Sequence, residues 1–297
     1  VKRFSMESFT IKDLENLSGI KAHTLRIWEQ RYNFLKPGRS FTNIRYYGND
    51  ELKKVLNIAL LNKYGYKISH IDKMNEAEIA ERILSLNQME AQQERIVHEL
   101  IKQMIDLDME AFENTLDRFI MARGIERAIT QVIFPFMEKI GVLWLTNHIN
   151  PAQEHLVTNI IRQKLIVGID GASSSISVNK SVLLFLPEGE YHEISLLFMH
   201  YILKSRGIQV IYLGANVPLT DIAYVAGLKK PDYLFTHLTS VSQHFNFDRF
   251  LANMRQKFSN TPVIISGKLT LSYEKKIQPP VFLKRSYAEV MQFVTNL

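Results

Sequence analysis

The feature that most constrains the fold is a regular alternation of short apolar segments and helical stretches across residues 181–297. The apolar segments cover residues 182–186, 209–213, 233–238, 262–265 and 281–283. Parallel strands need a crossover connection, usually a helix, so this order predicts a parallel α/β sheet with a flavodoxin-like outline. No Gly-x-Gly-x-x-Gly or Walker sequence follows any of these segments, which argues against binding of dinucleotides and nucleoside triphosphates.

His192 lies in the loop between the first of these strands and a helix predicted over residues 194–205. Ligands of open parallel sheets bind beyond the carboxyl ends of the strands, so an imidazole there is placed to bind a metal-containing cofactor. Glu190 is close enough to accept the other ring N–H, which fixes the tautomer and makes the ligating nitrogen more basic. A solvated loop histidine is the alternative interpretation.

The whole chain has 297 residues, a mass of 34.5 kDa and 46% hydrophobic residues, which suggests two or three packed domains. It contains no cysteine, and this excludes disulfides, thiolate metal sites and cysteine nucleophiles. No apolar run approaches the roughly 20 residues that span a bilayer. We therefore expect a cytoplasmic protein with no membrane partner, in which histidine leads any metal chemistry.

Positive charge is concentrated at the N-terminal end. Residues 1–75 contain 14 Lys and Arg against 7 Asp and Glu, whereas the remaining residues contain 22 against 23. Such asymmetry indicates an anionic partner of one domain, most often nucleic acid, although a solvated basic surface is a common alternative.

The same N-terminal end carries the signals of a helix-turn-helix. Thr10 is expected to cap a helix over residues 11–18, with Asp13 at the capping-box position. Gly19 then makes the turn to a second helix over about residues 21–32.

The second helix has one apolar and one polar face. Leu25 and Trp28 are expected to face inward, whereas His23, Thr24 and Arg26 are exposed toward base edges and phosphates. The segment that follows, residues 39–47, reads as a short hairpin wing in which arginines alternate with aromatic residues.

The ordered motif of this region resembles the winged-helix DNA-binding domain of MerR-type regulators. The motif consists of Thr24-Leu-Arg-Ile-Trp-Glu-Gln-Arg-Tyr32, Pro37, Arg39, Arg45-Tyr-Tyr47 and Asp50-Glu-Leu52. The resemblance implies a double-stranded, pseudo-palindromic DNA operator bound by at least two chains. Together with the exposed helix positions, the expected DNA contacts are His23, Thr24, Arg26, Arg39, Arg45, Tyr46 and Tyr47.

The middle of the chain predicts helices. Residues 76–94 are polar and suggest a linker or an exposed helix, after which an apolar periodicity typical of helices resumes at Ile96 and predicts a bundle of about four helices. The expected domains are a DNA-binding domain at 1–76, a linker or helix at 77–94, a four-helix bundle at 95–176 and the α/β domain at 177–297.

A motif in the bundle resembles the cobalamin-dependent, light-responsive repressors of the CarH and LitR group. Trp144 is followed after nine residues by Glu154 and His155, at the spacing of that group. The resemblance implies that these three residues cover the upper face of a corrinoid, although a core tryptophan and a charged helix start are the alternatives. The histidine that often follows the tryptophan in the group is Leu145 here, and His148 is a weak substitute.

The α/β segment resembles cobalamin-binding domains. Glu190-Tyr-His192-Glu-Ile-Ser195 is similar to their motif acidic-x-His-x-x-Gly, in which the histidine is the lower axial cobalt ligand, but Ser195 replaces the glycine. The family's Ser-x-Leu motif aligns best with His237-Leu-Thr239, and its Gly-Gly pair aligns with Ser266-Gly267. The further cofactor contacts that the resemblance implies are Thr239, Ser240, Ser242, Ser266 and Gly267.

These observations predict a multidomain transcriptional regulator, with a winged helix-turn-helix, a helical bundle and a flavodoxin-like, cobalamin-binding α/β domain. By resemblance, adenosylcobalamin would favour an operator-binding dimer or tetramer that represses, and light or cofactor loss would weaken DNA binding. The alternative is a MerR-type regulator that senses another small ligand or a protein partner. A cobalamin-dependent mutase or methyltransferase would need a substrate domain, for which no segment remains, so we expect no enzyme.

Overall fold

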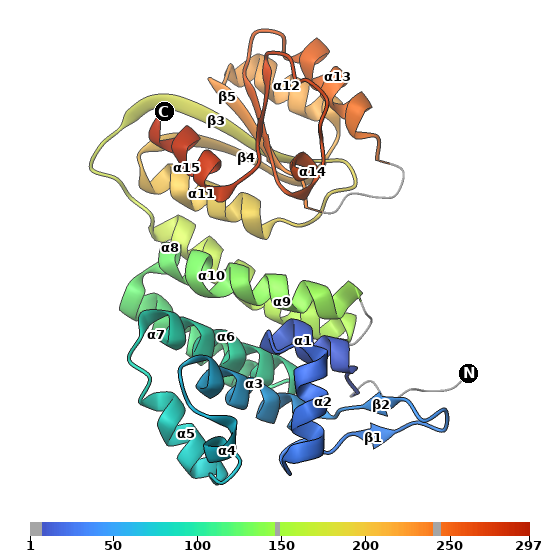
Figure 1. Cartoon of the computed structure of the whole chain (residues 1–297). Coiled ribbons are helices and arrows are strands. Elements are labelled where there is room, and N and C mark those ends of the chain that lie inside the picture. The colour runs from blue at the N-terminus through green and yellow to red at the C-terminus, as the bar shows by residue number, and fades with distance from the viewer. Residues whose placement is uncertain (1–7, 146–148, 240–244) are drawn as a thin grey trace. The chain divides into compact units, whose positions relative to one another are not determined.

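The computed structural model describes residues 8–145, 149–239 and 245–297, and it divides into two compact units, Val1–Ile160 and Ile161–Leu297 (Figure 1). The first unit contains α1 (Ile11–Ser18), α2 (Ala22–Arg31), β1 (Gly38–Arg39), β2 (Arg45–Tyr46), α3 (Asn49–Lys63), α4 (Ile68–Ile71), α5 (Glu76–Leu84), α6 (Met89–Ile105), α7 (Met109–Arg123), α8 (Ile125–Ala128), the π-helical turn η1 (Ile129–Ile133) and α9 (Phe134–Leu145). The boundary between the units falls within α10 (Pro151–Gly171).

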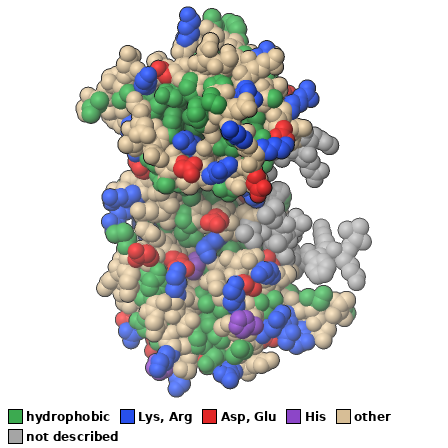
Figure 2. Space-filling model, turned by 45° about the horizontal axis from the view of Figure 1, so that its top comes forward, with side chains coloured by type: hydrophobic (Ala, Val, Ile, Leu, Met, Phe, Trp, Pro, Cys, Tyr) green, Lys and Arg blue, Asp and Glu red, His purple; other side chains and the backbone are tan. Residues whose placement is uncertain are grey.

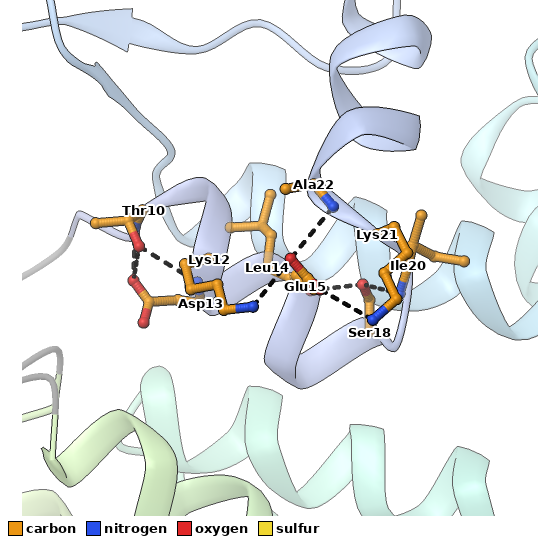
Figure 3. A network of polar contacts seen from close by, with 9 residues as sticks. All are labelled: Thr10, Lys12, Asp13, Leu14, Glu15, Ser18, Ile20, Lys21 and Ala22. Atoms are coloured by element: carbon orange, nitrogen blue, oxygen red, sulfur yellow. Dashed lines mark hydrogen bonds and ion pairs between the residues drawn. The ribbon is translucent and has the colours of Figure 1, made fainter.

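The helix-turn-helix prediction is confirmed. Thr10 and Asp13 form a capping box at the start of α1, and Gly19 ends that helix in the left-handed conformation with φ 76°. Glu15 then holds the start of α2, because its carboxylate accepts the backbone N–H of Ala22 over 3.3 Å (Figure 3). An acidic group at a helix N-terminus also interacts favourably with the helix dipole. The Lys12 ammonium beside it lowers the pKa of the Glu15 carboxyl, so the group stays ionised.

The hairpin wing and the helix after it also form as expected. Strand β1 pairs antiparallel with β2, with Arg39 opposite Arg45. Gly48 and Glu51 cap α3. Leu25 and Trp28 are buried with Leu14 and Leu52 in the small core of this region.

The helical bundle comprises α6, α7, the segment from α8 through η1 to α9, and the start of α10. Phe112 and Phe136 pack in its interior with their ring centroids 5.4 Å apart. Helix α6 begins at Met89, inside the segment expected to be a linker or exposed helix, and Ala91 is fully buried. Part of that polar segment therefore belongs to the bundle, because the first turn of α6 buries one small apolar residue, Ala91.

The winged-helix part packs on the bundle within the first unit, with α3 against α6 and α1 against α9. Lys63 Nζ lies 2.6 Å from Glu94 Oε2, and Lys53 Nζ lies 2.6 Å from Asp106 Oδ1. Lys139 donates to the backbone carbonyl of Leu17 at the end of α1. These contacts join the winged-helix part to the bundle by polar groups as well as by packing.

The second unit contains a five-stranded parallel sheet in the order β4-β3-β5-β6-β7, the flavodoxin-like order. Its elements are β3 (Val178–Pro187), α11 (Ile194–Ser205), β4 (Ile208–Val217), α12 (Leu219–Lys229), β5 (Tyr233–His237), α13 (Phe247–Lys257), β6 (Val263–Ser266), α14 (Lys268–Leu271), β7 (Val281–Lys284) and α15 (Tyr287–Thr295). Helices α11 and α15 cover one face of the sheet, and α12 and α13 cover the other (Figure 1). The predicted fold class is therefore confirmed.

Interior strand β3 is buried from Val182 through Pro187, which fits a strand covered on both faces. Its apolar side chains meet Ile222 of α12 and Leu251 of α13 in one core cluster. On the face drawn in Figure 2, both units carry Lys and Arg side chains, and acidic side chains are interspersed among these basic ones. Within the described part of the chain, no helix is both long and apolar enough to cross a bilayer.

Candidate functional site

The polar face of α2 is exposed as expected. His23 and Arg26 are exposed and Thr24 is half-buried, with His23 Nε2 3.3 Å from the Thr24 hydroxyl. The sequence reasoning missed that Ile27 is also 43% exposed on this helix. The exposed face thus offers one cation, two polar side chains and an apolar patch, which are the groups that contact phosphates, base edges and thymine methyls.

Glu29 joins the wing to α2, a role that the sequence reasoning missed. Its Oε1 accepts from Arg45 Nε over 2.8 Å, and its Oε2 accepts from the Tyr47 hydroxyl over 3.3 Å. Glu29 lies one helical turn after Leu25, and no short-range motif pairs it with residues 16 and 18 positions later. Only the folded wing brings the three side chains together.

The expectation that Tyr47 contacts DNA is wrong in this structure. Its side chain is fully buried beneath the wing, and burial raises the pKa of its hydroxyl to about 12. Tyr47 therefore supports the wing from inside. Arg45 remains half-exposed, but the Glu29 carboxylate neutralises part of its charge. Tyr46 is 43% exposed and faces outward from the same strand.

The tip of the wing carries Arg39 and Phe41. Arg39 is exposed and donates from Nη1 to the Asn43 side-chain oxygen over 2.6 Å. Phe41 is fully exposed, which is unusual for a large aromatic side chain. An apolar residue in the middle of a polar turn was the sequence signal for this exposure.

In the second unit, Glu190 and His192 form a connected polar site in the loop after β3. Glu190 follows β3 and is fully buried, whereas the His192 side chain is 55% exposed. Glu190 Oε1 lies 2.6 Å from His192 Nδ1 and also accepts the backbone N–H groups of Tyr191 and His192 over 3.0 Å. Because the carboxylate only accepts, Nδ1 carries a ring proton, and in the neutral ring the lone pair lies on Nε2.

Neighbouring strand ends brace this loop. The backbone N–H of Thr239, just after β5, donates to Glu190 Oε2 over 2.8 Å. Asn216, near the end of β4, accepts the backbone N–H of Gly189 over 2.9 Å through its side chain. The imidazole is thus held from three strands at the carboxyl edge of the sheet, the edge where parallel α/β sheets bind ligands.

A second polar group lies at the ends of β5 and β6. His237 Nδ1 is 2.9 Å from the Ser266 hydroxyl, and burial lowers the pKa of His237 to about 4, so its ring is neutral at pH 7. Ser266 is 1% exposed and is therefore turned into the protein. The Thr236 hydroxyl is fully buried and has no hydrogen-bond partner among the described residues. Sequence reasoning proposed no role for Thr236.

Gly267 has a positive φ of 102°, and a Cβ at this position would lie 2.4 Å from the backbone oxygen of Leu238. The glycine is therefore required by the close approach of β5 and β6. Its aligned role beside a cofactor remains a prediction that no contact in the structure tests.

Glu193, the residue after His192, links α10 to α11. Its Oε2 lies 2.7 Å from Arg162 Nη2, and its Oε1 accepts from the Tyr212 hydroxyl over 3.0 Å. Burial raises the pKa of Tyr212, so the phenol keeps the proton that it donates. Ser195 follows in the first turn of α11 and is half-buried.

The remaining predicted cofactor residues divide into described and undescribed ones. Glu154 Oε2 lies 3.6 Å from His155 Nδ1 in the first turn of α10, and Glu154 Oε1 accepts from the Thr158 hydroxyl. His155 is 74% exposed. The side chains of Trp144 and Leu145, and residues His148, Ser240 and Ser242, lie outside what the structure describes.

Two family models match parts of the chain. The model "MerR HTH family regulatory protein" matches residues 9–78, and the model "B12 binding domain" matches residues 96–167. The two matches cover the winged-helix part and most of the helical bundle.

Full-length relatives and solved structures also match. The chain is 26% identical over 275 residues to the HTH-type transcriptional repressor CarH of Myxococcus xanthus, covering 90% of this chain and 91% of that protein. It is 26% identical over 281 residues to the repressor CarA of the same organism, covering 94% and 92%. The monomethylamine corrinoid protein of Methanosarcina barkeri is similar in fold, with a TM-score of 0.50, 13% identity, and coverage of 69% of this chain and 100% of that one.

Proposed function

We propose that this chain, a homologue of the CarH and CarA repressors that combines a MerR-type helix-turn-helix with a B12-binding domain, is a DNA-binding transcriptional repressor controlled by a bound corrinoid. The observation that carries the cofactor half of the proposal is the imidazole of His192, held by the buried Glu190 at the carboxyl edge of the sheet. The similarity to the CarH and CarA repressors supports the regulatory half of the proposal.

The DNA-reading surface consists of α2 and the wing. His23, Thr24 and Arg26 would contact base edges and phosphates in the major groove, and Arg39, Arg45 and Tyr46 would contact the flanking backbone. Glu29 would act as a positioning residue, because it fixes Arg45 against α2. MerR-type recognition of a pseudo-palindrome requires a homo-oligomer, a dimer or tetramer, with one winged helix for each half-site.

The donor set at His192 fits a corrinoid. A carboxylate-oriented imidazole can offer Nε2 as a single metal ligand, and a corrin ring would supply the nitrogen ligands of its own cobalt. When bound, adenosylcobalamin would supply a cobalt centre with a light-sensitive upper substituent. The chain would contribute Nε2 of His192 as a cobalt ligand, with Glu190 fixing the ring.

Other side chains would enclose the cofactor. Trp144, Glu154 and His155 would cover its upper face, and Ser195, Thr239, Ser240, Ser242 and Gly267 would line the region below. Ser266 would act indirectly, because its hydroxyl is buried against His237. The unpartnered Thr236 hydroxyl supports a polar group in this region, since a buried hydroxyl without a hydrogen bond costs about 1–3 kcal/mol.

The chain would not be an enzyme. Its full-length relatives are repressors, and the corrinoid protein of Methanosarcina barkeri shares only the fold. A regulator that senses a different small ligand is not favoured, because the bundle matches a B12-binding model. Cofactor occupancy would control operator binding through the oligomeric state, as a coupling between two sites.

Absorption spectroscopy tests the cofactor half. Adenosylcobalamin is titrated in the dark into the purified chain, His192→Ala and the matched control His70→Ala, which removes an exposed imidazole of α4. We expect a saturable spectral change with the chain and with His70→Ala, and its loss in His192→Ala. No spectral change with the unsubstituted chain, or the same change in His192→Ala, would contradict the proposal.

A further inference from the structure

We propose that the bundle holds a second ligand site, for a small amphipathic organic anion, in a cavity of about 600 Å³ between α5, α6, α7 and η1. This volume lies within the range of about 300–1,000 Å³ for small-molecule sites. The cavity shares no lining residue with the Glu190 and His192 site. The proposal is therefore independent of the corrinoid.

Two helix faces form the cavity walls. On α7 the lining residues are Thr115, Arg118, Phe119, Ala122 and Arg123, and on α6 they are Met89, Gln92, Gln93, Arg95, Ile96 and Glu99. The spacings of three and four residues place each set on one side of its helix. The walls are thus continuous faces rather than scattered side chains.

The charge of the lining indicates an anion. Four arginines line the cavity, Arg95, Arg118, Arg123 and Arg127, and Glu99 is the single acidic lining residue. Glu99 Oε1 lies 3.9 Å from Arg118 Nη2, so that carboxylate is already associated with one of them. Arg95, Arg123 and Arg127 form no salt bridge with any residue in the described ranges. Guanidinium groups bind carboxylate, sulfonate and phosphate groups through paired N–H donors.

The rest of the lining indicates an apolar body on that anion. Ile96 and Phe119 line the wall, and Leu84 and Met89 are 67% and 56% exposed. Large apolar side chains beside a cationic cavity can be covered by the apolar part of an amphipathic ligand, whereas water leaves them exposed. An inorganic anion would leave them uncovered.

The backbone at this cavity is irregular, which is a separate indication of a ligand. The π-helical turn η1 interrupts the bundle helix, and it carries Gln131 into the lining. Single π-helical turns inside α-helices concentrate at functional sites. Gln93 donates from Nε2 to Gln131 Oε1 over 3.0 Å, which joins α6 to η1 and leaves amide groups of both residues at the cavity.

The cavity lies along the first part of α6, and the end of that helix contacts the start of α10. Gln153, beside Glu154, donates to the carbonyls of Met104 and Ile105 at the end of α6, whereas the cavity residues of α6 run from Met89 to Glu99. The rise of 1.5 Å per residue places Glu99 about 7.5 Å from Met104 along the helix axis. Leu84 is the last residue of α5, and α5 packs on α3 of the winged-helix part. A ligand in the cavity would therefore contact both the bundle and a helix that packs on the winged-helix part.

A fluorescence titration with 8-anilinonaphthalene-1-sulfonate, an aromatic sulfonate, tests the site in the full-length chain without cobalamin. The variants are Arg123→Ala/Arg127→Ala and the matched control Arg249→Ala/Arg255→Ala, whose arginines are exposed on α13. We expect the first pair to raise the dissociation constant at least tenfold, the control pair to leave it unchanged, and Arg123→Lys/Arg127→Lys to recover most of the affinity. Helical circular dichroism establishes that each variant is folded.

Competition then tests the class of ligand. Dodecanoate is expected to displace the probe, whereas potassium phosphate at the same ionic strength is not. Equal probe affinity in Arg123→Ala/Arg127→Ala and the unsubstituted chain would overturn the site, and equal displacement by phosphate would overturn the amphipathic class. Either failure leaves the corrinoid proposal intact, because the spectral titration with His192→Ala is read separately.

Discussion

The buried carboxylate of Glu190 accepts the backbone N–H of Thr239 over 2.8 Å, and so joins the loop after β3 to the loop after β5. Its other oxygen holds the His192 ring. One side chain therefore fixes both the orientation of an imidazole and the spacing of two strand ends. Outer partners of this kind typically change metal affinity by 10- to 100-fold when they are removed.

Glu190→Gln is expected to weaken adenosylcobalamin binding by about 10- to 100-fold, because an amide has one acceptor oxygen for the contacts that two carboxylate oxygens make. Equilibrium dialysis in the dark measures the affinity. Glu188→Gln is the matched control, since Glu188 is exposed in the same loop. A Glu190→Gln affinity equal to that of the control would show that the carboxylate does not act on the cofactor.

Glu29→Ala is expected to lower DNA affinity although it removes a negative charge from the reading surface. The reason is that Arg45 and Tyr47 lose their common acceptor, and the wing is then no longer fixed against α2. Fluorescence anisotropy with a duplex from the DNA flanking the gene measures the affinity. Tighter binding by Glu29→Ala would mean that its charge matters more than its contacts.

Arg26→Ala is expected to reduce the slope of log affinity against log salt by about 1, the change for one lost phosphate contact. The same anisotropy assay at a series of salt concentrations measures the slope. Arg82→Ala, which removes a cation from α5 outside the reading surface, serves as the control. An unchanged slope for Arg26→Ala would remove this residue from the DNA interface.

His98 predicts an acid-sensitive first unit. It is 2% exposed on α6, and burial together with nearby Lys139, Lys102 and Lys63 lowers its pKa to about 3. In the unfolded chain the imidazole takes up a proton near its ordinary pKa of 6.5, but in the folded chain it does not, so stability is complete above pH 6.5 and falls as the pH drops toward 3. At pH 5 the loss from this group approaches about 2 kcal/mol.

Urea unfolding of His98→Leu, followed by helical circular dichroism at pH 7.5 and 5.0, measures this effect. The variant is expected to lose less stability between the two pH values than the unsubstituted chain. An exposed-site variant, His70→Ala, is expected to keep the original pH dependence. The same pH loss in all three proteins would exclude His98 as the cause.

Cofactor binding is expected to change the oligomeric state. Gel filtration in the dark with adenosylcobalamin should show an apparent mass of at least twice the 34.5 kDa of one chain, and illumination before the run should lower it. His192→Ala is expected to elute at the same position with and without cofactor. If the unsubstituted chain elutes at the same position with and without cofactor and light, cofactor binding does not control assembly.

Local sequence signals were sufficient for most of the fold. The capping pair Thr10 and Asp13, the left-handed Gly19 and the apolar strands of the α/β segment each depend on interactions within a few residues. The Glu190 and His192 contact was also accessible, because the partners are two positions apart in the sequence. The apolar periodicity could not locate the start of α6, because the first turns of this helix contain mostly polar residues and bury only Ala91.

What the sequence could not give depends on long-range contacts. Tyr47 was expected on the DNA by resemblance to MerR-type domains, but its backbone bridges to Phe9 and the hydroxyl of its buried ring donates to Glu29. Thr236 was not recognised, and His237 was named only as part of an aligned motif, because their environment is made by β6, about thirty residues later. The arginine-lined cavity likewise requires two helices to converge.

The most direct test of the central claim is the affinity of the full-length chain for its flanking DNA, measured in the dark with and without adenosylcobalamin. We expect the cofactor to tighten binding at least tenfold, a coupling of about 1.4 kcal/mol, and we expect no such effect in His192→Ala. Equal DNA affinity of the unsubstituted chain with and without a saturating cofactor would contradict the account.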